Sequence, residues 1–417
     1  MKFRVVVAGF LLCALMARAE EEAGRAPSLV ACVTELAKVL ERYGLAPDAA
    51  RACEEAMRAI VIQADPGGGL YTAEDAERLE AAARGRVFHA GIKVSATNGQ
   101  MVVVEIAAES GAEQAGIQPG ETIETLDRGS VSGMKASDLA ELLRSTANVP
   151  VLLGVKGTNG EVRDVEVPLT VGSAPAVDLA EDLPTGIAYV RLNGLFEKSD
   201  REIISTLRRW VGTSTYGLVL DLRGADGADV DAAAAVASLF SQEGALLFSL
   251  RDTQDQDIAV YKARPAFRMD LPTMVLVDGR TSGAAEALAA ALAGSARGVM
   301  LIGDVTQGDP LIREFLDFSG DLKLHIATRK LVVADGITYT GREGVKPHLA
   351  ATPEMTPDYE PEMPEEEASK ITDEEREDRR LRDRVRGDSV LRRAVDLLQG
   401  LRALNIGTTR TPETAAR

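Results

Sequence analysis

The sequence predicts an α/β core joined to a small β-rich domain and to a helical N-terminal segment. Three runs have the unbroken apolar character of strands that a parallel sheet buries on both faces: residues 217–223, 273–277 and 299–303. Helical patterns at residues 230–240 and 282–293 lie between them, and such alternation is typical of sheets with crossover helices. Between residues 86 and 170 the pattern changes to short Val-rich strands and Gly-containing turns, which predicts a separate β-rich domain.

Composition narrows the class of protein. The chain has 417 residues, enough for two or three domains, and 45% hydrophobic with 27% charged residues is ordinary for a globular protein. These values exclude a multi-span membrane protein and a wholly disordered chain. With 47 basic against 64 acidic residues, the net charge of −17 repels phosphate backbones and anionic membranes, so nucleic acid is not an expected partner.

Cysteines and histidines are few. The chain has three of each, and neither a CxxC pair nor an HExxH motif occurs. We therefore expect no metal site and no cofactor.

The N-terminus has the pattern of an export signal. Lys2 and Arg4 precede an apolar run from Val5 to Met16, and small residues at Ala17 and Ala19 fit a signal-peptidase site. Residues 1–19 are therefore predicted to be a cleaved signal peptide, and the mature chain an exported protein of the periplasm or cell envelope. The run is too short for a permanent membrane span, although an uncleaved anchor is the alternative.

Two amphipathic helices are expected within an N-terminal helical segment at 28–84, over residues 29–43 and 48–61. Cys32 and Cys53 fall on their apolar faces and are expected to point inward. A Cys32–Cys53 disulfide and two reduced core cysteines are both compatible with the sequence.

The domain predicted at 86–170 resembles a PDZ domain. Residues 110–121, SGAEQAGIQPGE, are similar to the GSPAEKAGIKPGD segment of PDZ domains in bacterial proteases. Such domains bind a peptide C-terminus by strand addition, with backbone N–H groups of the preceding loop holding its carboxylate. The resemblance assigns that loop to His89, Ala90, Gly91 and Ile92, and the groove-lining helix to residues 136–143, with Leu139 and Leu143. Glycine at position 91 would let the backbone approach the carboxylate.

Segments on both sides of that domain resemble the carboxy-terminal-processing, or tail-specific, serine peptidases. Residues 64–74 are similar to the LDPYSxYLTPEE stretch that precedes the PDZ domain in this family. Residues 216–228, YGLVLDLRGADGA, resemble KGLVLDLRNNPGG of the peptidase domain. The resemblance covers about residues 29–349 and returns at 388–404. It implies a crotonase-like peptidase core at 180–352 with the PDZ domain inserted before it.

The catalytic positions implied by the resemblance are changed. The family uses a Ser nucleophile with a Lys general base, because a desolvated lysine loses its proton readily. Alignment of residues 278–286, DGRTSGAAE, on NGGSASASE puts Gly283 at the nucleophile position. Alignment of 303–309, GDVTQGD, on GEKTFGK puts Asp309 at the base position, and Arg313 stands where some members have an assisting Gln. Asp309 and Arg313 are expected to form a salt bridge.

An off-register nucleophile is the alternative. Ser282 adjoins Gly283, but one residue along a helix turns the side chain by about 100°. The nearest downstream lysines, Lys323 and Lys330, belong to the next strand region. A Ser–His–Asp arrangement would need His325 or His348.

The oxyanion hole is less altered. Backbone N–H groups near Gly227 and Ala284 are retained and are candidates for binding a carbonyl or carboxylate oxygen. Simple chain reversal is the structural alternative for the glycine-rich turn.

The C-terminal part divides in two. Residues 353–387 are predicted to be an acidic linker, either a solvated helix or a disordered segment. Residues 388–405 form an amphipathic helix capped by Asp388. Its apolar face docks either on the body of the protein or on a second subunit, so a homodimer is one of two alternatives.

The favoured hypothesis is an exported pseudo-peptidase of this family that binds the C-terminal tails of envelope or exported proteins through its PDZ groove. The alternatives are an active serine endopeptidase that uses Ser282, and a purely structural oligomer.

Overall fold

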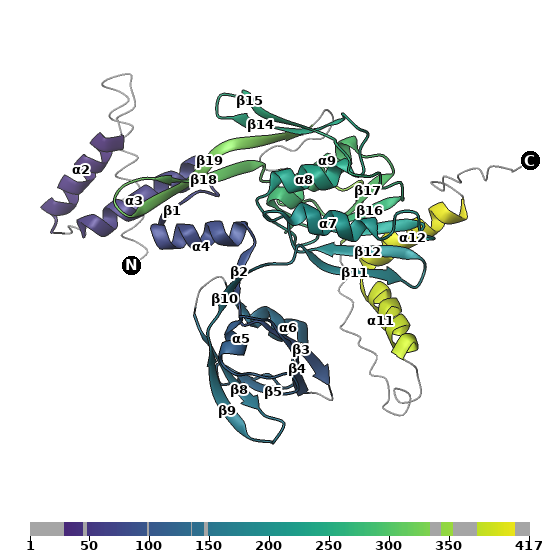
Figure 1. The fold of residues 1–417 in the computed structure, drawn as a ribbon. Coiled ribbons are helices and arrows are strands. Elements are labelled where there is room, and N and C mark those ends of the chain that lie inside the picture. Colours follow the sequence, from purple (N-terminus) through teal and green to yellow (C-terminus); the bar gives the residue numbers. More distant parts are fainter. Residues whose placement is uncertain are drawn as a thin grey trace, which may run out of the picture. The chain divides into compact units, whose positions relative to one another are not determined.

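The computed structural model describes residues 29–44, 48–97, 100–134, 136–145, 149–333, 343–352 and 373–404 (Figure 1). The expected signal peptide and residues 353–372 of the expected linker lie outside this part. Two compact units are present, Met1–Leu70 with Leu324–Ile326, and Tyr71–Lys323 with Ala327–Arg417. Within the described residues, no helix has both the length and the apolar character needed to cross a membrane.

The first unit contains helices α2 (Leu29–Arg42) and α3 (Ala49–Ala64), close to the predicted bounds. The inward orientation expected for Cys53 is wrong, because this residue is exposed, and Cys32 is only partly buried. Both thiols are free, so the disulfide alternative does not hold. No described side chain of either helix is buried. The apolar faces are present as predicted, but the described residues of this unit do not cover them.

A six-stranded sheet forms the centre of the second unit. Its order is β11-β12-β13-β16-β17-β20, so the strands add in chain order. The bounds are β11 Val177–Leu183, β12 Ile187–Leu192, β13 Gly217–Asp221, β16 Thr273–Val277, β17 Val299–Gly303 and β20 Leu349–Ala350. β11 is antiparallel to β12, and the other neighbours are parallel. Every residue of β13 and β16 is buried, as their apolar sequences predict.

Helices cover both faces of this sheet. α7 (Ser199–Arg208), α8 (Val230–Ser238) and α9 (Gly283–Ser295) pack on one face in a shared core. Helix α12 (Ser389–Ala403) covers the other face through five buried side chains, Val390, Leu391, Ala394, Val395 and Leu398. The C-terminal helix therefore docks on the body of its own chain, the first of the two alternatives. Helix α11 (Asp373–Gly387) lies beside it and occupies part of the expected linker.

Two hairpins were not predicted from the sequence. They are formed by β14 (Leu246–Asp252) with β15 (Asp257–Lys262), and by β18 (Leu311–Asp317) with β19 (Leu322–Val333). The strand region expected to contain Lys323 and Lys330 is nevertheless confirmed by β19. β14 also pairs with β19, which joins the hairpins into one sheet. Strand β1 (Gly69–Thr72) and helix α4 (Ala73–Ala83) precede the β-rich domain.

The β-rich domain has its own core, built around Met101, Val103, Ile117, Ile123, Leu139 and Leu153. Its main sheet has the order β3-β4-β5-β8-β9, with bounds β3 Ile92–Thr97, β4 Gln100–Ile106, β5 Thr122–Leu126, β8 Val151–Lys156 and β9 Val162–Val167; β6 (Gly129–Ser130) pairs with β5. A smaller sheet joins β10 (Thr170–Ser173), β2 (Arg86–His89) and β7 (Arg144–Ser145). Helices α5 (Gly111–Gln114) and α6 (Ala136–Leu142) complete the domain.

Candidate functional site

Gly283, at the predicted nucleophile position, is the first residue of α9. Its φ of +54° lies in the left-handed region, and a Cβ atom there would stand 2.3 Å from the carbonyl oxygen of Gly227. Real Cβ contacts do not come that close, so a side chain at this position requires the Gly227 carbonyl to move. In this backbone arrangement the position accepts glycine and nothing larger.

The Gly227 carbonyl also accepts the hydrogen bond of the N–H group that was predicted as an oxyanion donor. The N–H of Ala284 donates to the oxygen of Gly227 at 2.8 Å. Gly227 has a φ of +113°, and a Cβ atom on it would lie 2.1 Å from the carbonyl oxygen of Leu195. The turn is therefore held between Leu195 and the start of α9. An oxygen atom of a ligand would have to displace Gly227 to reach the Ala284 N–H.

A buried carboxylate brings position 309 to the first turn of α9. Glu286 is fully buried and accepts hydrogen bonds from the N–H groups of Gly308 at 2.6 Å and Asp309 at 3.1 Å, and from the Thr306 hydroxyl. The backbone of Asp309 is thereby fixed three residues along the helix from Gly283. Sequence reasoning did not single out Glu286, although it closes the motif DGRTSGAAE that positions the helix start.

The predicted salt bridge between Asp309 and Arg313 is confirmed. A guanidinium nitrogen of Arg313 lies 2.6 Å from Oδ2 of Asp309, and the Arg313 side chain is only 12% exposed. Asp309 also accepts the N–H of Leu311 at 3.2 Å. The base position thus holds a carboxylate tied to a guanidinium group, which does not lose its proton in proteins.

The alternative groups take structural positions. Ser282 is the N-cap residue of α9, its N–H donates to Ala225 at 3.0 Å, and its hydroxyl makes no capping hydrogen bond. Nδ1 of His348 accepts the N–H of Leu301 at 3.0 Å, which fixes that ring to β17. His325 belongs to the other compact unit. The two downstream lysines pair with carboxylates, Lys323 with Asp317 and Lys330 with Asp255.

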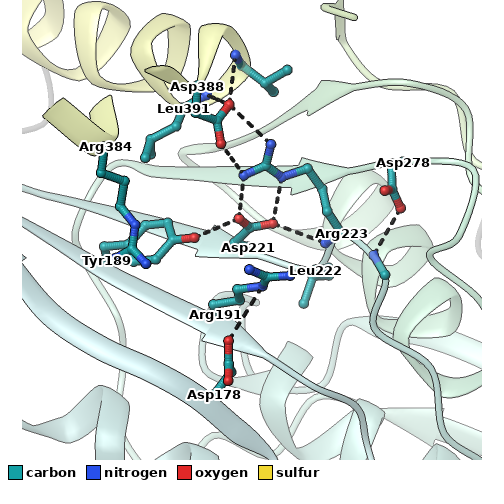
Figure 2. A network of polar contacts seen from close by, with 12 residues as sticks. Asp178, Tyr189, Arg191, Asp221, Leu222, Arg223, Asp278, Arg384, Asp388 and Leu391 are labelled. Atoms are coloured by element: carbon teal, nitrogen blue, oxygen red, sulfur yellow. Dashed lines mark hydrogen bonds and ion pairs between the residues drawn. The ribbon is translucent and has the colours of Figure 1, made fainter. Parts of the chain in front are cut away.

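A polar network lies at the end of β13 (Figure 2). Asp221 is fully buried, accepts the Tyr189 hydroxyl at 2.8 Å, and binds Arg223 through both carboxylate oxygens at 2.9 and 2.6 Å. Burial, reinforced by Asp221, raises the pKa of the Tyr189 hydroxyl. Burial alone would lower the pKa of Arg223, but the carboxylates of Asp221 and Asp388 outweigh it and raise that pKa.

Asp388 links this network to the C-terminal helix. Its carboxylate binds Arg223 at 2.6 and 3.2 Å and accepts the N–H groups of Val390 and Leu391 at the start of α12 (Figure 2). Burial would raise the pKa of Asp388, but Arg223 and the two N–H groups hold it below its ordinary value. The network therefore ties the N-terminus of α12 to the end of β13.

A second candidate site is a groove of about 280 Å³ in the β-rich domain. Its lining residues are Val87, His89, Gly91, Ile92, Lys93, Glu105, Ala107, Leu143, Ser173 and Pro175. The structure thus brings together four of the six residues predicted for peptide binding. Of the other two, Leu139 is fully buried in the domain core, and the N–H of buried Ala90 donates to the Leu143 carbonyl at 3.1 Å.

Glycine at position 91 has a different close neighbour from the one expected. A Cβ atom there would lie 2.1 Å from Cβ of Ser110, and its φ is +79°. The residue must therefore be glycine to admit the N-cap serine of α5.

The β-rich domain also has an open strand edge. Strand β3, which starts at Ile92, ends the sheet order, so within the described residues its outer edge pairs with no other strand. Helix α6 packs against the same strand. An edge strand beside a helix is the arrangement that accepts an extended peptide as an added strand.

Comparison with known proteins gives a family match within the second unit. Residues 186–351 match the family model described as "Peptidase family S41". The chain is also 26% identical to "Carboxy-terminal processing protease CtpA" of Bacillus subtilis (strain 168) over 270 residues, 64% of this chain and 56% of that protein. Residues 186–351 of this chain thus carry the match to peptidase family S41, and the chain is similar to C-terminal processing proteases.

Two further proteins are similar to this chain. "Carboxy-terminal-processing protease" of Bartonella bacilliformis is 25% identical over 329 residues, 77% of this chain and 74% of the relative. The solved structure "Photosystem II D1 C-terminal processing protease" is 24% identical, with a TM-score of 0.45 and coverage of 82% and 92%. The chain spans little more than half of the Bacillus relative it matches.

Proposed function

We propose that this chain is a non-hydrolytic member of peptidase family S41 that binds protein C-terminal tails through a PDZ domain at residues 86–170. The observation that carries the proposal is the Gly227 carbonyl. It fills the space of a side chain at Gly283 and occupies the N–H of Ala284. The backbone itself therefore stands where a nucleophile and an oxyanion would need room.

The chemistry of positions 283 and 309 supports the same conclusion. Acyl transfer by a serine and lysine pair needs a hydroxyl group and an uncharged amine within hydrogen-bonding reach. Position 283 offers no side chain, and Asp309 is engaged by Arg313 at 2.6 Å. A carboxylate held by a guanidinium group is a poor proton acceptor, because the pairing stabilises its charged form.

The groove beside β3 supports tail binding. Its lining includes the apolar side chains of Val87, Ile92, Ala107 and Leu143, which suits an apolar last side chain. The free edge of β3 supplies backbone groups to the peptide. The export pattern at residues 1–19 supports a location in the periplasm or cell envelope, so we propose that the tails belong to exported or envelope proteins.

Tail binding and hydrolysis are tested together on the full mature chain. An unstructured fluorescent peptide with an apolar free C-terminus is incubated with the chain, and binding is followed by anisotropy and cleavage by mass spectrometry. We expect saturable binding without turnover. Turnover that Ser282→Ala abolishes would establish the active-peptidase alternative and refute the proposal.

Two neighbouring alanines give a matched test of the binding site. Ala107 and Ala108 are both exposed, but only Ala107 lines the groove. We expect Ala107→Glu to weaken peptide binding at least tenfold, because it places a charged side chain among the apolar ones of the lining, and Ala108→Glu to leave it within twofold. Equal effects of the two changes would place the binding surface elsewhere.

A further inference from the structure

Two of the charged side chains that line the groove neutralise each other. Lys93 on β3 and Glu105 on β4 are register partners, and their charged groups lie 3.3 Å apart. The side chains are 72% and 68% exposed, so water screens them. This pair offers no uncompensated charge to a bound tail.

The loop before β3 has lost one of its backbone donors. The N–H of Ala90 donates to the Leu143 carbonyl at 3.1 Å. A carboxylate at this end of the groove cannot take that hydrogen bond without breaking the contact to Leu143. It would therefore depend more strongly on a side-chain donor.

His89 is placed to be that donor. It is the last residue of β2, is partly buried, and lines the groove. Its ring lies directly over Gly172 of the neighbouring strand β10, since a Cβ atom at Gly172 would stand 2.1 Å from Nε2. Within the described residues no hydrogen bond is made by the ring, since the hydrogen bond of His89 to the Thr170 hydroxyl uses the backbone oxygen. An imidazole always has at least one N–H to donate.

We propose that the His89 ring holds the terminal carboxylate of the bound tail, and that Gly172 positions the ring. The inference rests on the proposed function and specifies it: the ligands are peptides with an apolar last residue and a free C-terminal carboxylate. Gly172 acts through His89 and is a positioning residue.

The test compares two peptides that differ only at the last atom group. The full mature chain is titrated with a fluorescein-labelled peptide of sequence Gly-Ser-Gly-Ser-Thr-Leu-Val, as the free acid and as the amide. We expect the unchanged chain to prefer the free acid at least tenfold, since hydrogen bonds to charged groups have this strength. His89→Leu should weaken free-acid binding about tenfold and leave amide binding within twofold.

Two further variants separate the donor role from a packing role. Gly172→Ala keeps the imidazole but displaces it, so it should also lower the ratio of free-acid to amide affinity. His89→Asn retains a donor and should recover part of the preference if His89→Leu folds poorly. Lys156→Ala is the control: this lysine does not line the groove and pairs with Glu124 at 3.4 Å, so its loss should leave the ratio unchanged.

The outcomes distinguish this inference from the function on which it rests. If the unchanged chain binds neither peptide, the tail-binding proposal itself fails. If it binds both equally, or if His89→Leu weakens both alike, tail binding stands and the role of His89 is refuted.

Discussion

Restoring a serine at Gly283 should destabilise the protein and should not restore hydrolysis. The Cβ atom would lie 2.3 Å from the Gly227 oxygen, where contacts below 3.0 Å require a shift, so the carbonyl must move by 3.0 − 2.3 = 0.7 Å or more. That movement weakens the hydrogen bond to Ala284, a loss of about 1 kcal/mol. The φ of +54° adds about 1–2 kcal/mol for a residue with a side chain. We expect Gly283→Ser to lower the free energy of unfolding by about 2–3 kcal/mol.

Two glycine controls divide that loss into its causes. Gly279→Ser has an ordinary φ and would meet only the Val305 oxygen, at 3.7 Å, so it should be nearly neutral. Gly212→Ser has a φ of +74° with no atom within 4 Å, so it should show only the backbone part. Denaturant unfolding of each full-length variant ranks the three substitutions by their loss of stability, and tail cleavage is measured in parallel. A Gly283→Ser variant as stable as Gly279→Ser, or one that cleaves the tail, would refute the reasoning.

Three further predictions concern the polar contacts at the end of β13 and beside the first turn of α9. Asp388→Asn should lower the free energy of unfolding by about 1–3 kcal/mol at pH 7, because it weakens the contact to Arg223. The pKa of Asp388 is lowered in the folded state, so the contribution of its carboxylate is present above the unfolded pKa of about 3.9 and is lost as the pH falls. The difference in stability between the two proteins, measured by urea unfolding, should therefore narrow below about pH 4. Alanine substitutions at Asp309 and Arg313 should give a coupling energy of about 1–2 kcal/mol in a double-mutant cycle, and additive losses would show that the ion pair contributes nothing. Glu286→Gln presents an amide group to two backbone donors, so it should cost about 2–4 kcal/mol and speed hydrogen exchange at residues 308 and 309; unchanged exchange there would contradict the anchoring role.

The sequence located the buried strands of the core almost to the residue, because each is an apolar run bounded by turn residues. β16 and β17 have the predicted bounds. The hairpins β14–β15 and β18–β19 were missed because their strands mix apolar residues with charged ones such as Arg251, Asp257 and Glu314. Such strands are specified by pairing with neighbours distant in sequence, which no local pattern shows.

In the candidate sites, too, contacts between residues close in sequence could be predicted, and contacts between distant residues could not. The ion pair of Asp309 and Arg313 follows from two opposite charges at a short spacing, and it could be predicted. The contact between Gly227 and Gly283 joins residues far apart in the chain, so no local sequence pattern predicts it. An amphipathic pattern also identifies an apolar face without saying whether anything covers it, which is why the expected burial of Cys53 failed.

The strands of the central sheet follow one another along the chain, yet the helix that closes its second face comes from the chain's far end. Without residues 389–403, the side chains of Tyr189, Val219 and Leu276 would form an exposed apolar surface on the sheet. Exposed sheets of this kind associate with other chains, so a protein cut short before Asp388 would aggregate rather than mature. The exposed face of the sheet is therefore protected from such association only once this later segment has docked on it.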